Sequence, residues 1–177
     1  MIDRKIAYDL VSAQHPEQNM LQHAIDSERV MRALAAHFGE DADVWGLAGL
    51  LHDIDYPMTK NSPEKHGVLA AELLAGKVTD DIIYAIQAHN TECTGVEPKS
   101  MMDLALRAGE SVTGLVTAAA LVRPTGMEGM QASSLKKKMK DKSFAASVDR
   151  ERIKECERIG LALDQFLTLA IGAMSEK

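Results

Sequence analysis

The sequence lacks a cysteine framework, a long apolar run and the alternating pattern of β-strands. Its two cysteines, Cys93 and Cys156, are far apart and do not have the spacing of a disulfide-stapled fold, so we expect reduced thiols. No stretch approaches the ~20 consecutive apolar residues that a membrane span requires. The N-terminal segment MIDRKIAYDLVSAQHPEQ has no apolar signal core. These absences predict a cytoplasmic protein without a membrane partner.

Positive charge is also scarce. The chain holds 20 Lys and Arg residues against 26 Asp and Glu residues, a formal net charge of −6. Because nonspecific affinity for phosphate backbones comes mainly from Lys and Arg, this balance predicts no nucleic-acid polymer as a partner and favours a small phosphorylated substrate. The run KKKMKDK at 136–142 is the one strong local concentration of positive charge. Its first interpretation is a solvated helix face; the alternative is that it and Arg123 reach over a site to hold a distal phosphate.

Helix-forming residues dominate the rest of the chain, which proline and glycine punctuate, and we expect an all-α fold. The 177 residues, 46% of them hydrophobic, are enough for one sizeable core and too few for two, so a single domain over 1–177 is expected. A loop is expected at 54–63 and a turn at His15, to which we assign no function. The expected helices span 3–13, 17–38, 41–53, 64–76, 79–89, 99–122, 131–140, 149–158 and 162–175.

Histidines lie on the inward faces or at the ends of successive expected helices. A buried helix face repeats at positions three, four and seven residues away, and His23, His66 and His89 each share such a face with apolar residues. The doublet His52-Asp53 follows the apolar run WGLAGLL, which indicates a central, buried helix. A buried carboxylate at this place needs a cation or hydrogen-bonding partners, because its desolvation alone is very costly.

Taken singly, each of these histidines is more readily explained as a core residue bonded to a backbone carbonyl. Four histidines with a carboxylate favour a metal site instead, since these are the donors that divalent first-row ions prefer. We predict one or two divalent ions, drawn from Mn, Fe, Zn, Co, Ni or Mg. His37 follows His23 by 14 residues, which is ~21 Å along a helix. It cannot share the ion and is expected to interact with the helix C-terminus.

This pattern resembles the HD-domain metal-dependent phosphohydrolases, whose signature is an early histidine, a His-Asp doublet at a helix end and a later aspartate. The resemblance rests on His23, His52-Asp53 and the segments LLHDIDY, EKHGVLAAELL and IIYAIQAHN, and it covers about residues 20–122, with 123–177 as a C-terminal helical extension. His66 and His89 are similar to the extra histidines of the subgroup that holds two metal ions. The resemblance implies that Asp53 bridges these ions and is the central catalytic residue.

The family's last ligand is an aspartate in a segment resembling ADELTGL, and here the corresponding stretch is AGESVTGL, residues 108–115. This alignment places Glu110 in the position of the metal-binding aspartate. Glutamate keeps the carboxylate and adds one methylene, so it ligates from further back, acts through water or leaves the first ion weakly held. The alternatives are that Glu110 is only a polar helix residue, or that Asp103, seven residues earlier on the same face, replaces it.

The implied activity is hydrolysis of a phosphoester or phosphoanhydride of a small molecule, such as a nucleotide, by metal-activated water. Two ions about 3.5–4 Å apart polarise a phosphoryl oxygen and lower the pKa of a bridging water, so no side-chain nucleophile is required. The chain accordingly shows no Ser–His or Cys–His arrangement at a recognisable spacing. Lys60 and Lys65, which lie after the doublet and beside His66, are the predicted substrate-binding residues.

Two other functions stay open at this point. Some relatives of this fold use a di-iron pair to activate oxygen, and the same histidines would serve that chemistry. The substitution at Glu110 also allows a catalytically weakened metal- and nucleotide-binding regulatory protein. The exposed faces of the C-terminal helices could pair, which makes a homo-oligomer possible.

Overall fold

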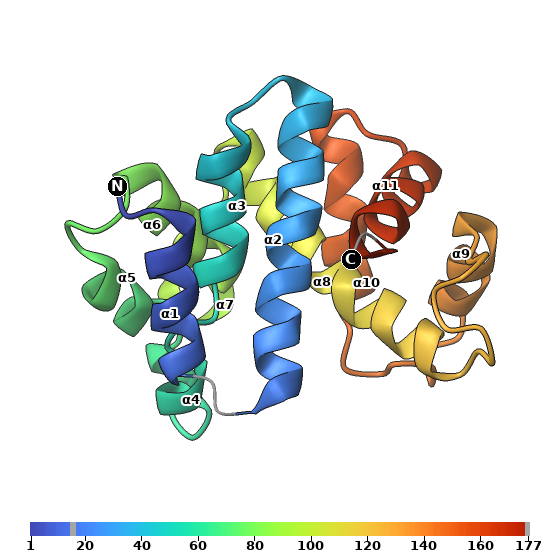
Figure 1. The fold of residues 1–177 in the computed structure, drawn as a ribbon, viewed down its shortest axis with the longest axis horizontal. Coiled ribbons are helices and arrows are strands. Elements are labelled where there is room, and N and C mark those ends of the chain that lie inside the picture. Colours follow the sequence, from blue (N-terminus) through green and yellow to red (C-terminus); the bar gives the residue numbers. More distant parts are fainter. Residues whose placement is uncertain (15–16, 176–177) are drawn as a thin grey trace.

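The structure, a computed structural model, describes residues 1–14 and 17–175, and every regular element in these ranges is a helix (Figure 1). The predicted all-α fold is thereby confirmed. The turn expected at His15 lies outside the described residues. The elements are α1 (Arg4–Gln14), α2 (Gln18–Phe38), α3 (Ala42–Leu51), α4 (Tyr56–Thr59), the 3-10 turn η1 (Pro63–Lys65), α5 (Val68–Leu74), α6 (Asp80–His89), α7 (Thr91–Thr94), α8 (Met101–Leu121), α9 (Ala132–Lys140), α10 (Arg150–Lys154), the 3-10 turn η2 (Glu155–Ile159) and α11 (Leu163–Ser175).

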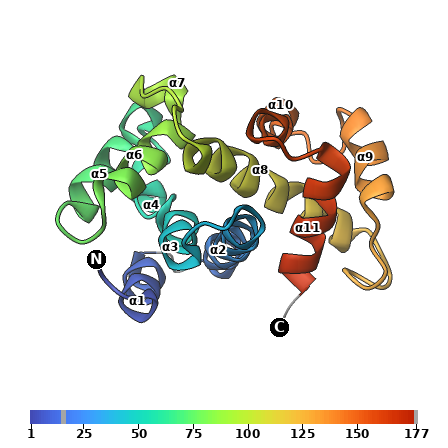
Figure 2. The ribbon, with the colours of Figure 1, turned by 90° about the horizontal axis from the view of Figure 1, so that it is seen from above.

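Two helices of 21 residues each, α2 and α8, form the centre of the molecule. Helix α2 packs against α3, α8 and α11, while α6 packs against α3 and α8. Seen from above, α5, α6 and α7 lie at one end of α8, and α9, α10 and α11 lie at its other end (Figure 2). The C-terminal helices α9, α10 and α11 each contact α8.

The apolar helix α3 lies unusually close to α2. Its residues from Trp45 to Leu51 are all buried. A Cβ atom built on Gly49 would lie 2.6 Å from the backbone oxygen of Ser27 on α2, so only glycine permits this approach of the two backbones. The close packing brings the C-terminal end of α3, where His52 follows, against the N-terminal half of α2, where His23 lies.

The helix expected at 64–76 is the largest error of the sequence-based assignment. His66 has an extended backbone (φ −66°, ψ 127°), and Gly67, with φ 86°, precedes α5. The carboxylate of Asp55 accepts hydrogen bonds from the backbone N–H groups of Gly67 (2.8 Å) and Ala70 (3.0 Å), so a residue from an earlier segment caps this helix. Local periodicity does not reveal a cap that comes from elsewhere in the chain. The short helices α4 and α7 were not expected either.

Helix α8 is long and apolar enough, by length and composition, to cross a membrane. Its most apolar 18-residue window is nevertheless 61% buried inside the fold. The core helix of a compact protein passes the same test, so α8 is weak evidence for a membrane span.

Candidate metal centre

Five of the six predicted metal ligands lie together, although they come from separate segments. His23 is on α2, His52 and Asp53 follow α3, His66 precedes α5, and His89 is the last residue of α6. Their ligand atoms form two groups that share Asp53, and within each group all of these atoms lie within 4.8 Å of one another.

The two oxygens of Asp53 face different histidine pairs. Oδ2 lies 3.9 Å from Nε2 of His23 and 3.5 Å from Nε2 of His52. Oδ1 lies 3.2 Å from Nε2 of His66 and 3.5 Å from Nε2 of His89. Within each pair the two Nε2 atoms are 3.2 Å apart. Each oxygen of Asp53 therefore lies beside one histidine pair, in two groups that could each hold an ion.

His52 and His89 are oriented by the last turn of their own helices. The Nδ1–H of His52 donates to the backbone oxygen of Gly49 at 2.8 Å, and the Nδ1–H of His89 donates to that of Ile86. These two bonds fix each ring so that its Nε2 faces Asp53 and the other histidines. A histidine three residues after a carbonyl of the last helical turn is thus oriented by its own helix.

His23 is oriented from the neighbouring helix. Its Nδ1 lies 2.9 Å from Oγ1 of Thr113 on α8, and the Thr113 hydroxyl donates to the backbone oxygen of Glu110 at 2.7 Å. Because the hydroxyl proton is used in that bond, Thr113 accepts from the Nδ1–H of His23. Nε2 of His23 then faces Asp53 and His52.

His66 is oriented by Asp55, the fully buried carboxylate that also caps α5. The Nδ1–H of His66 donates to Oδ1 of Asp55 at 2.8 Å. A carboxylate that holds the far nitrogen of a histidine ligand fixes the orientation of the ring and raises its basicity. The sequence-based interpretation overlooked Asp55, although its place two residues after Asp53 in HDID was a usable signal.

The donor set fits divalent cations. Two Nε2 atoms that lie 3.2 Å apart need a shared proton or a cation between or beside them, because two bare lone pairs would repel. Each half of the site offers two imidazole nitrogens and one carboxylate oxygen, a three-ligand set that leaves coordination positions open. The two halves could each hold one ion, with Asp53 shared.

Burial and neighbouring groups set the protonation of the site. Burial lowers the pKa of His52 to about 3, so this ring is neutral. Burial would also lower the pKa of His66, but its hydrogen bonds to Asp53 and Asp55 outweigh this effect and raise it to about 10. Burial by itself would raise the pKa of Asp53, but the surrounding histidines hold this pKa well below the usual range. Asp53 is therefore ionised, and His66 binds a proton whenever no metal competes for its Nε2.

These pKa values predict that chelator-treated protein is most stable near pH 6.5. His66, with a pKa raised to about 10, contributes stability that is complete below its unfolded pKa of about 6.5 and is lost as the pH rises towards 10. His52, with a pKa lowered to about 3, contributes stability that is present above about 6.5 and is lost as the pH falls towards 3. Thermal denaturation between pH 4 and 10 measures the loss of stability on both sides of this optimum, the acid limb and the alkaline limb. The variant His66→Gln should lose only the alkaline limb, and an unchanged alkaline limb in this variant would contradict the assignment.

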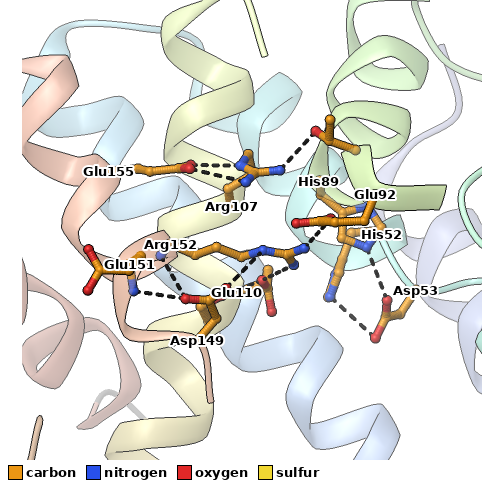
Figure 3. A network of polar contacts seen from close by, with 12 residues as sticks. His52, Asp53, His89, Glu92, Arg107, Glu110, Asp149, Glu151, Arg152 and Glu155 are labelled. Carbon is orange, nitrogen blue, oxygen red and sulfur yellow. Dashed lines mark hydrogen bonds and ion pairs between the residues drawn. The ribbon is translucent and has the colours of Figure 1, made fainter. Parts of the chain in front are cut away.

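Glu110, the sixth predicted ligand, lies outside both groups in the part of the chain that the structure describes. Its Oε1 accepts from the Ser111 hydroxyl at 2.5 Å and lies 3.7 Å from Nη1 of Arg152 (Figure 3). Burial raises the pKa of Glu110, and the charge of His23 and the hydrogen bond from Ser111 partly offset this rise. Its role as a ligand stays a prediction. Asp103 caps α8 by accepting from the backbone N–H groups of Lys99 and Ser100, which explains its burial without a metal.

Arg152, on α10, is a second residue that the sequence-based interpretation overlooked. Its guanidinium pairs with Glu92 at 2.6 Å and extends towards the side on which His52 and His89 lie (Figure 3). His23, Glu110 and Arg152 line a pocket of about 220 Å³, together with Ser111, Gly114, Ser147, Val148 and Asp149. No sequence signal identified Arg152, because Glu92 is 60 residues away.

The predicted substrate-binding lysines, Lys60 and Lys65, are exposed, and their amino groups have no hydrogen bond or ion pair within the described ranges. Their role stays a prediction. The basic run 136–142 belongs to α9 and the segment after it, at the end of the molecule opposite α5 and α6 (Figure 2). Arg123 donates to the backbone oxygens of Gly126 and Glu128 in its own loop. Arg123 is thus used within its own loop, and the alternative in which the run 136–142 holds a distal phosphate stays a prediction.

Comparison with known proteins gives a family match and several related sequences. A family model described as "HD domain" matches residues 20–122. Ribonuclease Y of Desulfotalea psychrophila is 30% identical over 168 residues, which cover 90% of this chain and 32% of that protein. Ribonuclease Y of Oleidesulfovibrio alaskensis is 36% identical over 99 residues, 55% of this chain and 18% of that protein. The chain thus spans about a third or less of the length of these relatives. No solved structure matches it significantly.

The expectation that excluded a nucleic-acid polymer as a partner is wrong, because it is contradicted by relatives that are named ribonucleases. It rested on the net charge, which averages over the whole chain. Residues 1–122 hold 9 basic and 18 acidic residues, whereas residues 123–177 hold 11 basic and 8 acidic residues. A net charge of −6 is therefore compatible with a basic surface on the C-terminal part.

The family assignment rests on two agreeing observations. The matched range, 20–122, is 103 of the 177 residues and includes every histidine and carboxylate of the two ligand groups. The resemblance that the sequence motifs indicated is thereby confirmed. The chain belongs to the HD domain family.

Proposed function

We propose that this chain is a metal-dependent phosphohydrolase that cleaves phosphodiester bonds in RNA. The observation that carries the proposal is the position of Asp53, with one oxygen directed at His23 and His52 and the other at His66 and His89. RNA as the substrate class is supported by the ribonuclease names of the relatives.

The five clustered residues are the proposed ligands. His23, His52 and Oδ2 of Asp53 would hold one divalent ion, and His66, His89 and Oδ1 of Asp53 would hold a second. Imidazole and carboxylate donors accept Mn, Fe, Zn, Co and Ni, and carboxylate also suits Mg, so ion identity depends on geometry and availability.

When bound, such ions supply Lewis-acid polarisation of the phosphoryl group and water of lowered pKa. The protein's own residues keep the donors ready for this task. Asp53 stays ionised and His52 stays neutral, because their pKa values are far from the physiological range. The Thr113 hydroxyl donates to Glu110 and accepts from His23, so it is occupied in positioning and is not an available nucleophile.

The pocket of about 220 Å³ beside His23 is the proposed place of the reacting phosphate. Arg152 supplies a fixed positive charge on its wall, and its guanidinium is well suited to phosphate oxygens. Since this wall comes from α10, we propose that residues 123–177 belong to the same functional unit as residues 20–122, as expected for a single domain over 1–177.

Metal loading tests the proposed activity. Chelator-treated protein would be loaded in turn with Mn, Fe, Co, Ni, Zn and Mg and given an end-labelled single-stranded RNA beside a panel of mono- and dinucleotides. We expect shortening of the RNA with at least one ion. A fully metal-loaded protein that binds RNA and cleaves none of these substrates would refute hydrolysis. Oxygen uptake by the iron form without hydrolysis would indicate the oxygenase alternative.

Glu110 either supports a metal ion or serves only as a structural partner of Arg152, and a substitution distinguishes these two roles. If Glu110 supports the ion at His23 and His52, Glu110→Gln should lower the affinity for that ion about 10- to 100-fold, as for residues that support a metal ligand. The affinity for the ion at His66 and His89 should not change. Elemental analysis after dialysis against graded ion concentrations measures both. Unchanged binding at both places would show that Glu110 serves only Arg152, and higher activity in Glu110→Asp would show that the natural glutamate impairs the site.

A further inference from the structure

A second, larger pocket lies between α9, the segment 141–149, α10 and the start of α11. Its volume is about 680 Å³, within the range of small-molecule and cofactor sites. Five basic residues and one acidic residue line it beside four apolar residues. They are Lys136, Lys140, Lys142, Arg150, Lys154 and Glu151, with Met139, Ala146, Val148 and Leu163.

Two of these cations are not neutralised by the protein. Lys136 pairs with Asp164 at 2.9 Å, and Lys154 pairs with Glu151 at 2.7 Å. Lys140 and Lys142 are exposed, and neither has a carboxylate partner within the described ranges. Their charge therefore faces solvent at the rim of the pocket, in the part of the chain where basic residues outnumber acidic ones.

The wall of the pocket is organised by Arg150. Its guanidinium donates to the backbone oxygen of Ala145 at 2.6 Å and to those of Phe144 and Val148. Ala145 itself has a left-handed backbone, with φ 45°. The Arg150 side chain thus connects several carbonyl groups of the segment 141–149, which forms this wall of the pocket.

The pocket adjoins the smaller pocket that His23 lines. Val148 lines both this pocket and the smaller one that contains His23, so the segment around Val148 separates the two hollows. A chain molecule whose phosphate lies beside His23 could continue over this segment into the basic pocket. A free mononucleotide would occupy one hollow alone.

We propose that the basic pocket binds the RNA strand next to the scissile phosphate. Lys140 and Lys142 contact backbone phosphates, and a base lies on the apolar surface of Met139 and Leu163. A cationic groove that tracks the phosphate backbone is a general means of binding single strands. The inference rests on the proposed function for its substrate class, but no proposed metal ligand lines the pocket.

Fluorescence anisotropy with a labelled 12-nucleotide single-stranded RNA tests the pocket separately from catalysis. The whole chain is used in chelator, so that no cleavage occurs. For the double variant Lys140→Ala, Lys142→Ala we expect a Kd raised about tenfold at low salt. The slope of log K against log salt should fall by about 1.4, because each phosphate contact on a single strand contributes about 0.7.

Two further variants serve as controls. Lys5→Ala, Lys77→Ala removes two exposed lysines that do not line the pocket and should leave the Kd and the salt slope unchanged. Lys140→Arg, Lys142→Arg keeps the charge and should retain the affinity of the natural protein.

Several results would overturn the proposal. Equal Kd and slope in the natural protein and the double alanine variant would exclude a role for the pocket. If AMP bound as tightly as the RNA and the double alanine variant lost affinity for both equally, the pocket would be a nucleotide site. If polyglutamate competed as well as RNA, the pocket would be a general polyanion surface. A metal-loaded protein that fails to cleave RNA, while the double variant still loses binding, would refute the proposed function and leave the RNA pocket standing.

Discussion

Asp53→Ala should remove both ions and lower RNA hydrolysis by about 10³-fold or more, since bound ions supply several kcal/mol of transition-state stabilisation and 1.36 kcal/mol corresponds to a factor of ten. The reason is geometric. One carboxylate faces both histidine pairs, so its removal takes an oxygen donor from each half of the site at once. Elemental analysis of the purified variant and an RNA cleavage assay measure the two effects.

The natural control is Asp81→Ala, which removes an exposed carboxylate from the first turn of α6 and should leave metal content and activity unchanged. A second comparison uses histidines of the same helix. His23→Ala should lose one ion, whereas His37→Ala, at the far end of α2, should keep both. Two ions retained in Asp53→Ala would refute the bridging role of Asp53.

Asp55→Ala should destabilise the protein by about 3–5 kcal/mol, because unsatisfied buried donors cost about 1–3 kcal/mol each. For a chain of this size such a loss lowers Tm by roughly 10 °C. The fully buried carboxylate of Asp55 accepts from the backbone N–H groups of Gly67 and Ala70 and from Nδ1 of His66, and alanine leaves all three without this partner. Thermal and chemical denaturation in chelator measure the loss without a contribution from bound metal.

Asp55→Asn separates the capping role from the metal role. Its amide oxygen can still accept from Gly67 and Ala70, so much of the stability should remain. The amide NH₂ group would face Nδ1 of His66, which must then accept, and the ring proton moves to Nε2. We expect the ion at His66 and His89 to bind about 10- to 100-fold more weakly, as for other residues that orient a metal ligand. Calorimetric metal titration measures this change.

A matched control is Asp103→Asn, which alters another buried carboxylate that caps a helix. It should reduce stability and leave metal affinity unchanged. If Asp55→Asn bound both ions as tightly as the natural protein, the role of Asp55 in orienting His66 would be wrong.

The sequence was most informative where the structure depends on short-range periodicity. The apolar run before His52 predicted a buried helix ending at the doublet, and α3 ends at Leu51. The positions of His23 and His89 on helices were predicted correctly for the same reason. His66 was placed on a helix and instead lies in an extended segment, because the cap that starts α5 comes from Asp55.

Charge was the least reliable guide. A sum over all residues does not show where charges gather, and the fold places five of the eleven basic residues of 123–177 around one pocket. Arg152 illustrates the same limitation, since its value as a cation beside His23 depends on the packing of α10 against α8.

The sequence by itself determined the helical class, the kinds of ligand and the family to which they belong, because helix periodicity and motif spacing extend over only a few residues. Only the tertiary structure decided which oxygen of Asp53 faces which histidines and which nitrogen of each ring is free. The partners that settle these points are distant in the chain: Thr113 is 90 residues from His23, and Asp55 is 11 residues from His66. Hydrogen bonds between such residues form only when packing brings their helices together, and no local pattern encodes them.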